Sequence, residues 1–168
     1  MTYHFIHVPR TGGTSIRQAI RGLDWIKYHG PGFDPRRLPP HAKTIMVRRP
    51  EAGRFASAVR WAIQRYSHEP QVAALIEAGI TTPRQFRDGI REKDPLVLAE
   101  VLNHSHYVGR RFPVFKITYM PTSYWLESAD YEIPFEDIRT EFPKLVYKLT
   151  RQYTRVRQTN RTDRDYVV

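Results

Sequence analysis

The stretch that decides the fold is residues 3–23, YHFIHVPRTGGTSIRQAIRGL. Residues 3–8 are rich in aromatic and β-branched side chains, a composition typical of a strand. Pro9 ends this strand, because proline cannot donate to a sheet ladder. Apolar side chains then recur at helical spacing and predict a helix that begins near Thr14; they are Ile16, Ala19, Ile20 and Leu23. The stretch therefore predicts a strand, a loop and a helix.

The loop of this unit, RTGG at residues 10–13, has the composition of a phosphate-binding loop. Two glycines let the backbone approach an anion closely, and a helix start directs free N–H groups toward it. Arg10 adds a fixed cation, and three side chains add hydroxyl donors: Thr11, Thr14 and Ser15. The nucleotide triphosphatase loop is a different pattern, since it ends in Gly-Lys-Ser/Thr.

The run Pro9-Arg10-Thr11-Gly12-Gly13-Thr14-Ser15 resembles the 5′-phosphosulfate loop of the carbohydrate sulfotransferases, usually written Pro-Lys-Thr-Gly-Gly-Thr-Ser. That family uses 3′-phosphoadenosine 5′-phosphosulfate as its sulfuryl donor. The resemblance implies that all seven residues bind the donor and that Arg10 acts in catalysis by neutralising the bridging oxygen. Arg10 replaces the usual lysine, and arginine does not donate a proton at ordinary pH. The residues alone also allow an ordinary strand–turn–helix corner with incidental glycines.

A second stretch, residues 47–58, combines basic and hydroxyl side chains at the start of a helix. It follows a predicted strand over residues 43–48, and Pro50 suits the first helical turn. Three side chains share one face of this helix, opposite an apolar stripe: Arg54, Ser57 and Trp61. This face either holds an anion or is a solvated basic surface.

The same stretch resembles the family's 3′-phosphate element, usually Arg-Asp-Pro-x-x-Arg-Phe-x-Ser. The resemblance implies that Arg48 and Ser57 contact the 3′-phosphate of the donor. Two departures are present: Arg49 replaces the acidic residue, and one extra residue precedes Arg54.

The rest of the pattern predicts an α/β fold, with a single-domain parallel sheet and flanking helices joined by right-handed βαβ connections. Further strands are predicted at residues 25–28, 114–118 and 131–135, and helices at residues 71–78, 83–91, 95–103 and from about 139 to 149. The resemblance implies a P-loop-like sulfotransferase fold over residues 1–168, with a polar tail at 151–168. Residues 131–138 and 157–161 resemble the family's late strand with its acidic corner and its terminal loop.

Sulfuryl transfer also requires a base for the acceptor hydroxyl. His29 follows the strand at residues 25–28, and parallel strands gather active sites at their carboxyl ends, so we expect His29 beside the first loop. The run Tyr28-His29-Gly30 also resembles the segment that supplies the base in glycan 2-O-sulfotransferases, although Pro31 stands where those enzymes have a second histidine. Glutamates are the alternative bases: Glu51 and Glu69.

The composition favours an anionic partner, because the chain contains 27 Lys and Arg but only 17 Asp and Glu, which gives a net charge of +10. Charge alone does not choose between a nucleotide, an acidic glycan and nucleic acid. The chain has no cysteine, so disulfides and cysteine-based metal sites are excluded. His104 and His106 have no third ligand in reach, so no metal is expected. No apolar run is long enough for a membrane span and no leader is apparent, so we expect a cytoplasmic protein without a membrane partner.

The leading hypothesis is a sulfotransferase that acts on a hydroxyl of a carbohydrate or another small acceptor. The alternative is a non-catalytic nucleotide or polyanion-binding protein on the same fold. A kinase of the P-loop type lacks the expected Lys-Ser/Thr pair, and nucleic-acid binding would depend on charge alone, so both are disfavoured.

Overall fold

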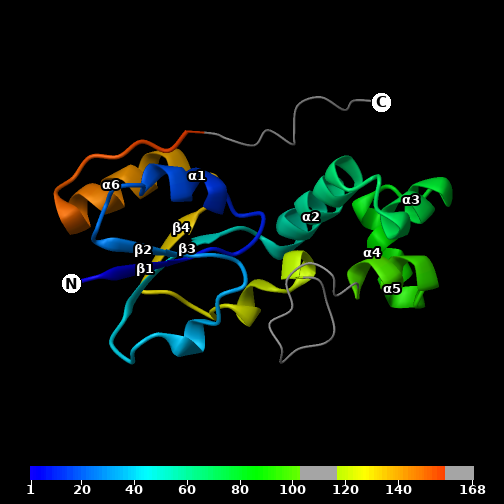
Figure 1. Cartoon of the computed structure of the whole chain (residues 1–168), viewed down its shortest axis with the longest axis horizontal. Helices are drawn as coiled ribbons and strands as arrows, with labels where there is room; N and C mark the ends of the chain where they lie inside the picture. The colour runs from blue at the N-terminus through cyan, green and yellow to red at the C-terminus, as the bar shows by residue number, and fades with distance from the viewer. Residues whose placement is uncertain (103–116, 158–168) are drawn as a thin grey trace. The chain divides into compact units, whose positions relative to one another are not determined.

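The computed structural model describes residues 1–102 and 117–157. Among these residues the chain forms two compact units. Residues 1–50 and 121–157 form the first unit, which contains the sheet, and residues 51–102 and 117–120 form the second, which is helical (Figure 1).

The first unit is built on a four-stranded parallel sheet with the strand order β2-β1-β3-β4. Its strands are β1 (Tyr3–Ile6), β2 (Ile26–His29), β3 (Lys43–Arg48) and β4 (Tyr131–Pro134). The predicted α/β class with a parallel sheet is confirmed, and these four predicted strands agree with the structure to within two residues. Ile6 pairs with both His29 and Met46, so the carboxyl ends of the three neighbouring strands lie at nearly the same level.

Two helices, α1 (Gly13–Ala19) and α6 (Ile138–Thr150), cover one face of this sheet (Figure 1). Side chains alternate along a strand, so Phe5 and Val47 point to this face and pack in its core. The other core residues are Ile16, Ile20, Ile26, Ile45, Ile133, Ile138, Phe142, Val146 and Val156. Helix α1 is shorter than predicted, because the chain turns after it and Gly22 adopts a φ of 85°. Leu23 still packs against the core, which explains why the apolar spacing continued past the helix.

Loops with short 3₁₀ helices lie along the other face of the sheet, at residues 30–42 and 121–130, the second of which contains Thr122–Tyr124 (Figure 1). Ile6 and Met46 point to this side and are fully buried. The indole N–H of Trp125 donates to the carbonyl of Pro31 at 2.9 Å and joins the two loops. The proline-rich segment contains one short 3₁₀ helix, Pro35–Arg37.

The register between β3 and β4 is reinforced by Asp130, just before β4. Its carboxylate accepts from Lys43 Nζ at 2.7 Å, from the Thr44 N–H at 2.9 Å and from Thr44 Oγ1 at 3.0 Å. The carboxylate of the residue before β4 thus holds the start of β3 beside the start of β4.

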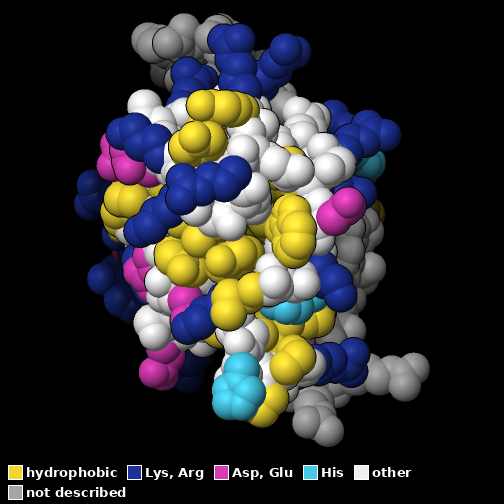
Figure 2. Space-filling view, turned by 90° about the vertical axis from the view of Figure 1, so that its left-hand side faces the viewer, with side chains coloured by type: hydrophobic (Ala, Val, Ile, Leu, Met, Phe, Trp, Pro, Cys, Tyr) yellow, Lys and Arg dark blue, Asp and Glu magenta, His cyan; other side chains and the backbone are white. Residues whose placement is uncertain are grey.

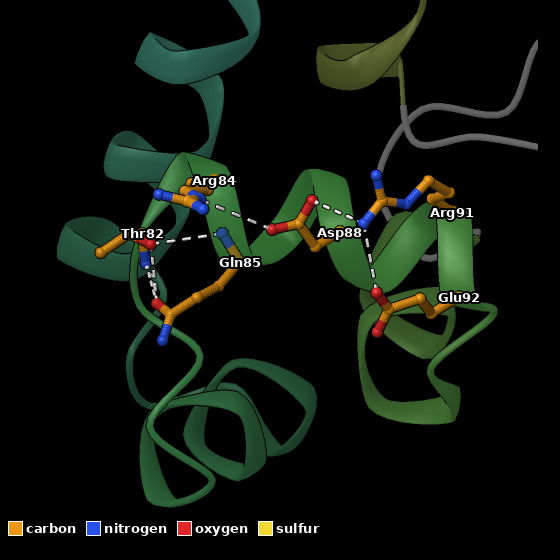
Figure 3. A network of polar contacts seen from close by, with 6 residues as sticks. All are labelled: Thr82, Arg84, Gln85, Asp88, Arg91 and Glu92. Atoms are coloured by element: carbon orange, nitrogen blue, oxygen red, sulfur yellow. Dashed lines mark hydrogen bonds and ion pairs between the residues drawn. The ribbon is translucent and has the colours of Figure 1, made fainter.

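The second unit contains four helices, α2 (Glu51–Arg65), α3 (Pro70–Glu77), α4 (Pro83–Glu92) and α5 (Pro95–Val101). These confirm the predicted helices, and α5 ends at Val101 with Leu102 as its C-cap. Their core consists of Ala58, Val59, Ala62, Leu75, Phe86, Val97, Val101 and Tyr119. Helix α4 begins with a reciprocal capping box between Thr82 and Gln85, and ion pairs follow along its exposed face at Asp88 (Figure 3).

Three predictions concern residues at or beyond the limits of the described chain. Of the strand predicted at residues 114–118, only 117 and 118 are described, and they belong to a 3₁₀ turn, Ile117–Tyr119, so the prediction is wrong for these two. His104 and His106 lie outside the described residues, as does all but the first residue of the predicted terminal loop at 157–161. Among the described residues, no helix has the length and apolar character needed to cross a membrane.

Candidate functional site: the loop after β1

The loop after β1 lies at the point where the strand order reverses. Strand β2 lies on one side of β1 and β3 on the other, so the connections that leave β1 and β3 diverge at the carboxyl edge. In open α/β sheets this is where ligands bind, in the crevice outside the strand ends. Residues 9–15, His29 and Arg48 all follow or end strands at this edge.

The loop itself contains two residues with left-handed backbone conformation. Gly12 has a φ of 79°, and a Cβ atom at this position would lie 2.9 Å from Ile138 Cδ1 and 3.4 Å from a ring carbon of Phe135. Arg10 has a φ of 65°, which is unusual for a residue with a side chain. The loop is therefore a tight, specified turn and not a relaxed connection.

The hydroxyl of Thr11 is turned into the protein. Thr11 is fully buried, and its Oγ1 donates to the carbonyl of Val8 at 2.7 Å. This corrects the expectation that Thr11 offers a hydroxyl to an anion, because its single hydroxyl proton is already used. Any contact of Thr11 with an anion would go through its backbone. Thr14 is exposed and Ser15 is partly exposed in the first turn of α1, so the roles predicted for these two remain predictions.

Beneath the loop, His7 contacts Gly13 and Tyr28. The Tyr28 hydroxyl and His7 Nδ1 share a hydrogen bond, and Arg17 lies 5.7 Å from the centre of the Tyr28 ring. Burial, helped by the charges of Arg10 and Arg17, lowers the pKa of His7 to about 4, and burial raises the pKa of Tyr28 to about 12. At neutral pH both groups are uncharged, so the loop rests on a neutral imidazole.

His29 ends β2, as predicted, and its carbonyl accepts from the His7 N–H at 3.0 Å. Its ring points to the opposite face from His7, where Nε2 lies 2.9 Å from His4 Nδ1 and the ring centre lies 3.9 Å from that of Phe33. Burial, followed by the charges of His4 and Lys27, lowers the pKa of His29 below 6.5. His29 is therefore neutral at pH 7, the form that a general base requires.

The two arginines at the end of β3 point in different directions. Arg48 donates from Nε and Nη2 to the two carboxylate oxygens of Glu132, at 2.7 and 2.6 Å, and also from Nη2 to the carbonyl of Glu127. Arg49 instead donates from Nη1 to the carbonyl of Arg10 at 3.2 Å. The structure thus joins Arg49 to the first loop, a contact that the sequence reasoning missed.

A signal for Arg49 was present in the sequence. The first two arginines of the 3′-phosphate pattern are five residues apart, and so are Arg49 and Arg54, with Phe55 and Ser57 then in register. A match that starts at Arg49 needs no extra residue before Arg54, but it places Pro50 and Glu51 at the positions of the pattern's aspartate and proline.

The predicted second phosphate element is divided between the two units, with Arg48 in the first and Arg54 and Ser57 in the second. Ser57 and Arg54 on α2 are buried, so the alternative of a solvated basic face is wrong for both. Arg54 donates to Glu51 at 3.0 Å and to the carbonyls of Thr118 and Met120, and so ties α2 to the segment that follows α5. Arg48 and Ser57 lie in different units, and their joint contact with one phosphate remains a prediction.

Positive charge is spread over the face of the molecule that Figure 2 shows. Figure 2 shows one face of the molecule, where Lys and Arg side chains lie among hydrophobic and a few acidic ones. Within residues 1–102 and 117–157, no group of three or more His, Asp or Glu side chains is arranged to hold a metal ion.

These features define an α/β protein with a tightly turned, glycine-bearing loop at the strand-order reversal of a parallel sheet. Comparisons with protein-family models, with curated proteins and with solved structures find no match to this chain.

Proposed function

We propose that this protein is a sulfotransferase, with a P-loop-like sulfotransferase fold, that uses 3′-phosphoadenosine 5′-phosphosulfate and acts on a hydroxyl of a carbohydrate or another small acceptor. One observation carries the proposal. The seven-residue run that resembles the 5′-phosphosulfate loop spans the turn after β1 and the first turn of α1, at the strand-order reversal, with left-handed residues at Arg10 and Gly12. The proposal includes a cytoplasmic location.

The residues of this chain would divide the chemistry between them. Backbone N–H groups of residues 11–15 and the Arg10 guanidinium would hold the 5′ end of the donor, and Arg48 with Ser57 would hold the 3′ end. In sulfuryl transfer, the acceptor oxygen bonds to sulfur while the bridging sulfur–oxygen bond breaks, and its electron pair stays on the departing phosphate. Arg10 would stabilise this charge. In the tautomer in which His29 Nε2 donates to His4 Nδ1, Nδ1 of His29 would take the acceptor proton.

The donor assignment is tested by thermal shift with adenosine 3′,5′-bisphosphate, 5′-AMP and ATP. We expect the bisphosphate to raise the melting temperature most, because only it can fill both predicted phosphate sites. No response to the bisphosphate would contradict the proposed donor.

The site assignment is tested by calorimetry on Arg10→Ala and Ser57→Ala. A lost charge-assisted or neutral hydrogen bond weakens binding by roughly 3- to 100-fold, with Arg10→Ala at the upper end. Arg37→Ala is a matched control, because Arg37 is an exposed cation in the loop at residues 30–42. Unchanged bisphosphate affinity in both site variants would remove the assignment.

The second candidate is a nucleotide or polyanion binder without turnover. Two observations favour it: arginine at position 10 does not donate a proton, and the His29 ring is hydrogen-bonded to His4. A sulfate-transfer assay with a panel of carbohydrate and small hydroxyl acceptors distinguishes the candidates. Bisphosphate binding together with donor turnover supports the enzyme, and binding without transfer to any acceptor supports the binder.

A further inference from the structure

The turn at Arg10 is the part of the loop that is hardest to explain from local sequence. Its φ of 65° lies in the left-handed region, where a side chain meets the backbone, and glycine or asparagine is the usual occupant. Such a conformation persists only when surrounding contacts enforce it. One of the described contacts acts on the Arg10 backbone itself.

Arg49 makes such a contact. Its Nη1 donates to the Arg10 carbonyl at 3.2 Å. This bond joins the segment that follows β3 to the segment that follows β1. The guanidinium of arginine has five N–H donors in a rigid planar fork, and this bond uses one of the five.

Phe135 fixes the Arg49 guanidinium from the other side. The guanidinium carbon lies 4.3 Å from the centre of the Phe135 ring, a cation–π arrangement. The Phe135 N–H donates to the Arg48 carbonyl at 2.8 Å, so the ring is anchored to the end of β3. The same ring lies against Gly12. One aromatic side chain thus contacts both the loop and the arginine that holds it.

We propose that Arg49, stacked on Phe135, is the positioning residue of the loop at residues 9–15: it holds the Arg10 turn through the Arg10 carbonyl and so sets the loop for the 5′ group of the ligand. The assignment of a ligand rests on the proposed function, whereas the positioning of the loop does not. Neighbouring Arg48 is no substitute, since its guanidinium is bound to Glu132 and Glu127.

The first test uses the ligand-free protein. Hydrogen–deuterium exchange is followed in peptides that cover residues 9–15 and 138–150, for the wild type, Arg49→Met, Arg49→Lys and the control Arg37→Met. We expect exchange in the loop to rise at least fivefold in Arg49→Met and clearly in Arg49→Lys, because lysine lacks the planar fork. Exchange in α6 should change less than twofold. Loop exchange at the wild-type rate in both Arg49 variants would overturn the inference.

The second test uses adenosine 3′,5′-bisphosphate and 5′-AMP. If Arg49 acts on the loop, Arg49→Met weakens both ligands by a similar factor of about tenfold, because both carry a 5′ phosphate. Weakening of the bisphosphate alone would place Arg49 at the 3′ end and overturn its role at the 5′ end. If the wild type binds neither nucleotide, the proposed function fails, and the exchange measurement still decides whether Arg49 holds the loop.

A third variant tests the stacking of Arg49 on Phe135 separately. Phe135→Leu keeps an apolar side chain against Gly12 but removes the aromatic face under Arg49. We expect loop exchange to rise in this variant and not to rise further when Arg49→Met is added, since both changes break the same contact. Independent, multiplicative effects would contradict the proposed stacking role.

Discussion

The imidazole of His7 occupies the space that a side chain at Gly13 would need: a Cβ atom at Gly13 would lie 1.9 Å from His7 Cδ2 and 2.2 Å from His7 Nε2. These distances are far below van der Waals contact, and the ring is held by its hydrogen bond to Tyr28. Gly13 is therefore required for close approach, whereas Gly12 is required for its left-handed turn.

Gly13→Ala should lower the free energy of unfolding by about 1–3 kcal/mol, because the methyl group overlaps the His7 ring. The measurement is urea unfolding. Gly32→Ala is a suitable control, since nothing lies within 4 Å of a Cβ atom there. In the double variant His7→Ala/Gly13→Ala the effects should not add, because the first change removes the overlap. Additive losses would show that the two residues do not compete for the same space.

The stability of the protein should fall as pH decreases from about 6.5 to 4, and His7 should account for part of this fall. The pKa of His7 is lowered to about 4 by burial in the folded state and is near 6.5 when unfolded, so the unfolded chain takes up the proton first. The resulting loss in the free energy of unfolding is complete below about pH 4 and amounts to roughly 3 kcal/mol. Urea midpoints for the wild type and His7→Gln at pH 7.5, 5.5 and 4 measure it. Equal pH dependence in the two proteins would contradict the assignment.

Asp130→Ala should destabilise the sheet unit by about 1–3 kcal/mol, because it removes three hydrogen bonds between β3 and the start of β4. Hydrogen bonds from Lys43 and Thr44 lower the pKa of Asp130 to about 2. The carboxylate's contribution is therefore present above pH 4 and lost as pH falls toward 2. Asp24→Ala, at an exposed turn, is the control for loss of one acidic group. A wild-type urea midpoint in Asp130→Ala at pH 7 would contradict this role.

If the protein transfers sulfate, His29→Gln should lower kcat by about 10²- to 10⁴-fold, the range for loss of a general base. Wild-type activity should rise with pH, with its midpoint below 6.5, because burial, His4 and Lys27 lower the pKa of His29. In His4→Gln one of these charges is gone, so the midpoint should move up. Full activity in His29→Gln would assign the base elsewhere, with Glu51 and Glu69 the remaining candidates.

The local elements of this protein follow from its sequence because their signals are local. The continuous apolar centre of residues 43–48 marks β3, and the prolines that open α3, α4 and α5 mark helix starts that need no distant partner. The α/β class and the parallel sheet follow from the order of these elements. The loop composition at residues 9–15 likewise comes from the sequence alone, and it is the basis of the proposed function.

Only the tertiary structure decided which side chains meet at the candidate site. Arg54 became a buried tie to two carbonyls 64 and 66 residues away, which no local pattern reveals, and Thr11 was buried with its hydroxyl bonded to the carbonyl of Val8. Arg48 and Arg49 are adjacent in sequence, yet strand alternation and the β3–β4 register direct one to Glu132 and the other to the loop. Register depends on contacts between segments about 85 residues apart, so composition and spacing do not determine it.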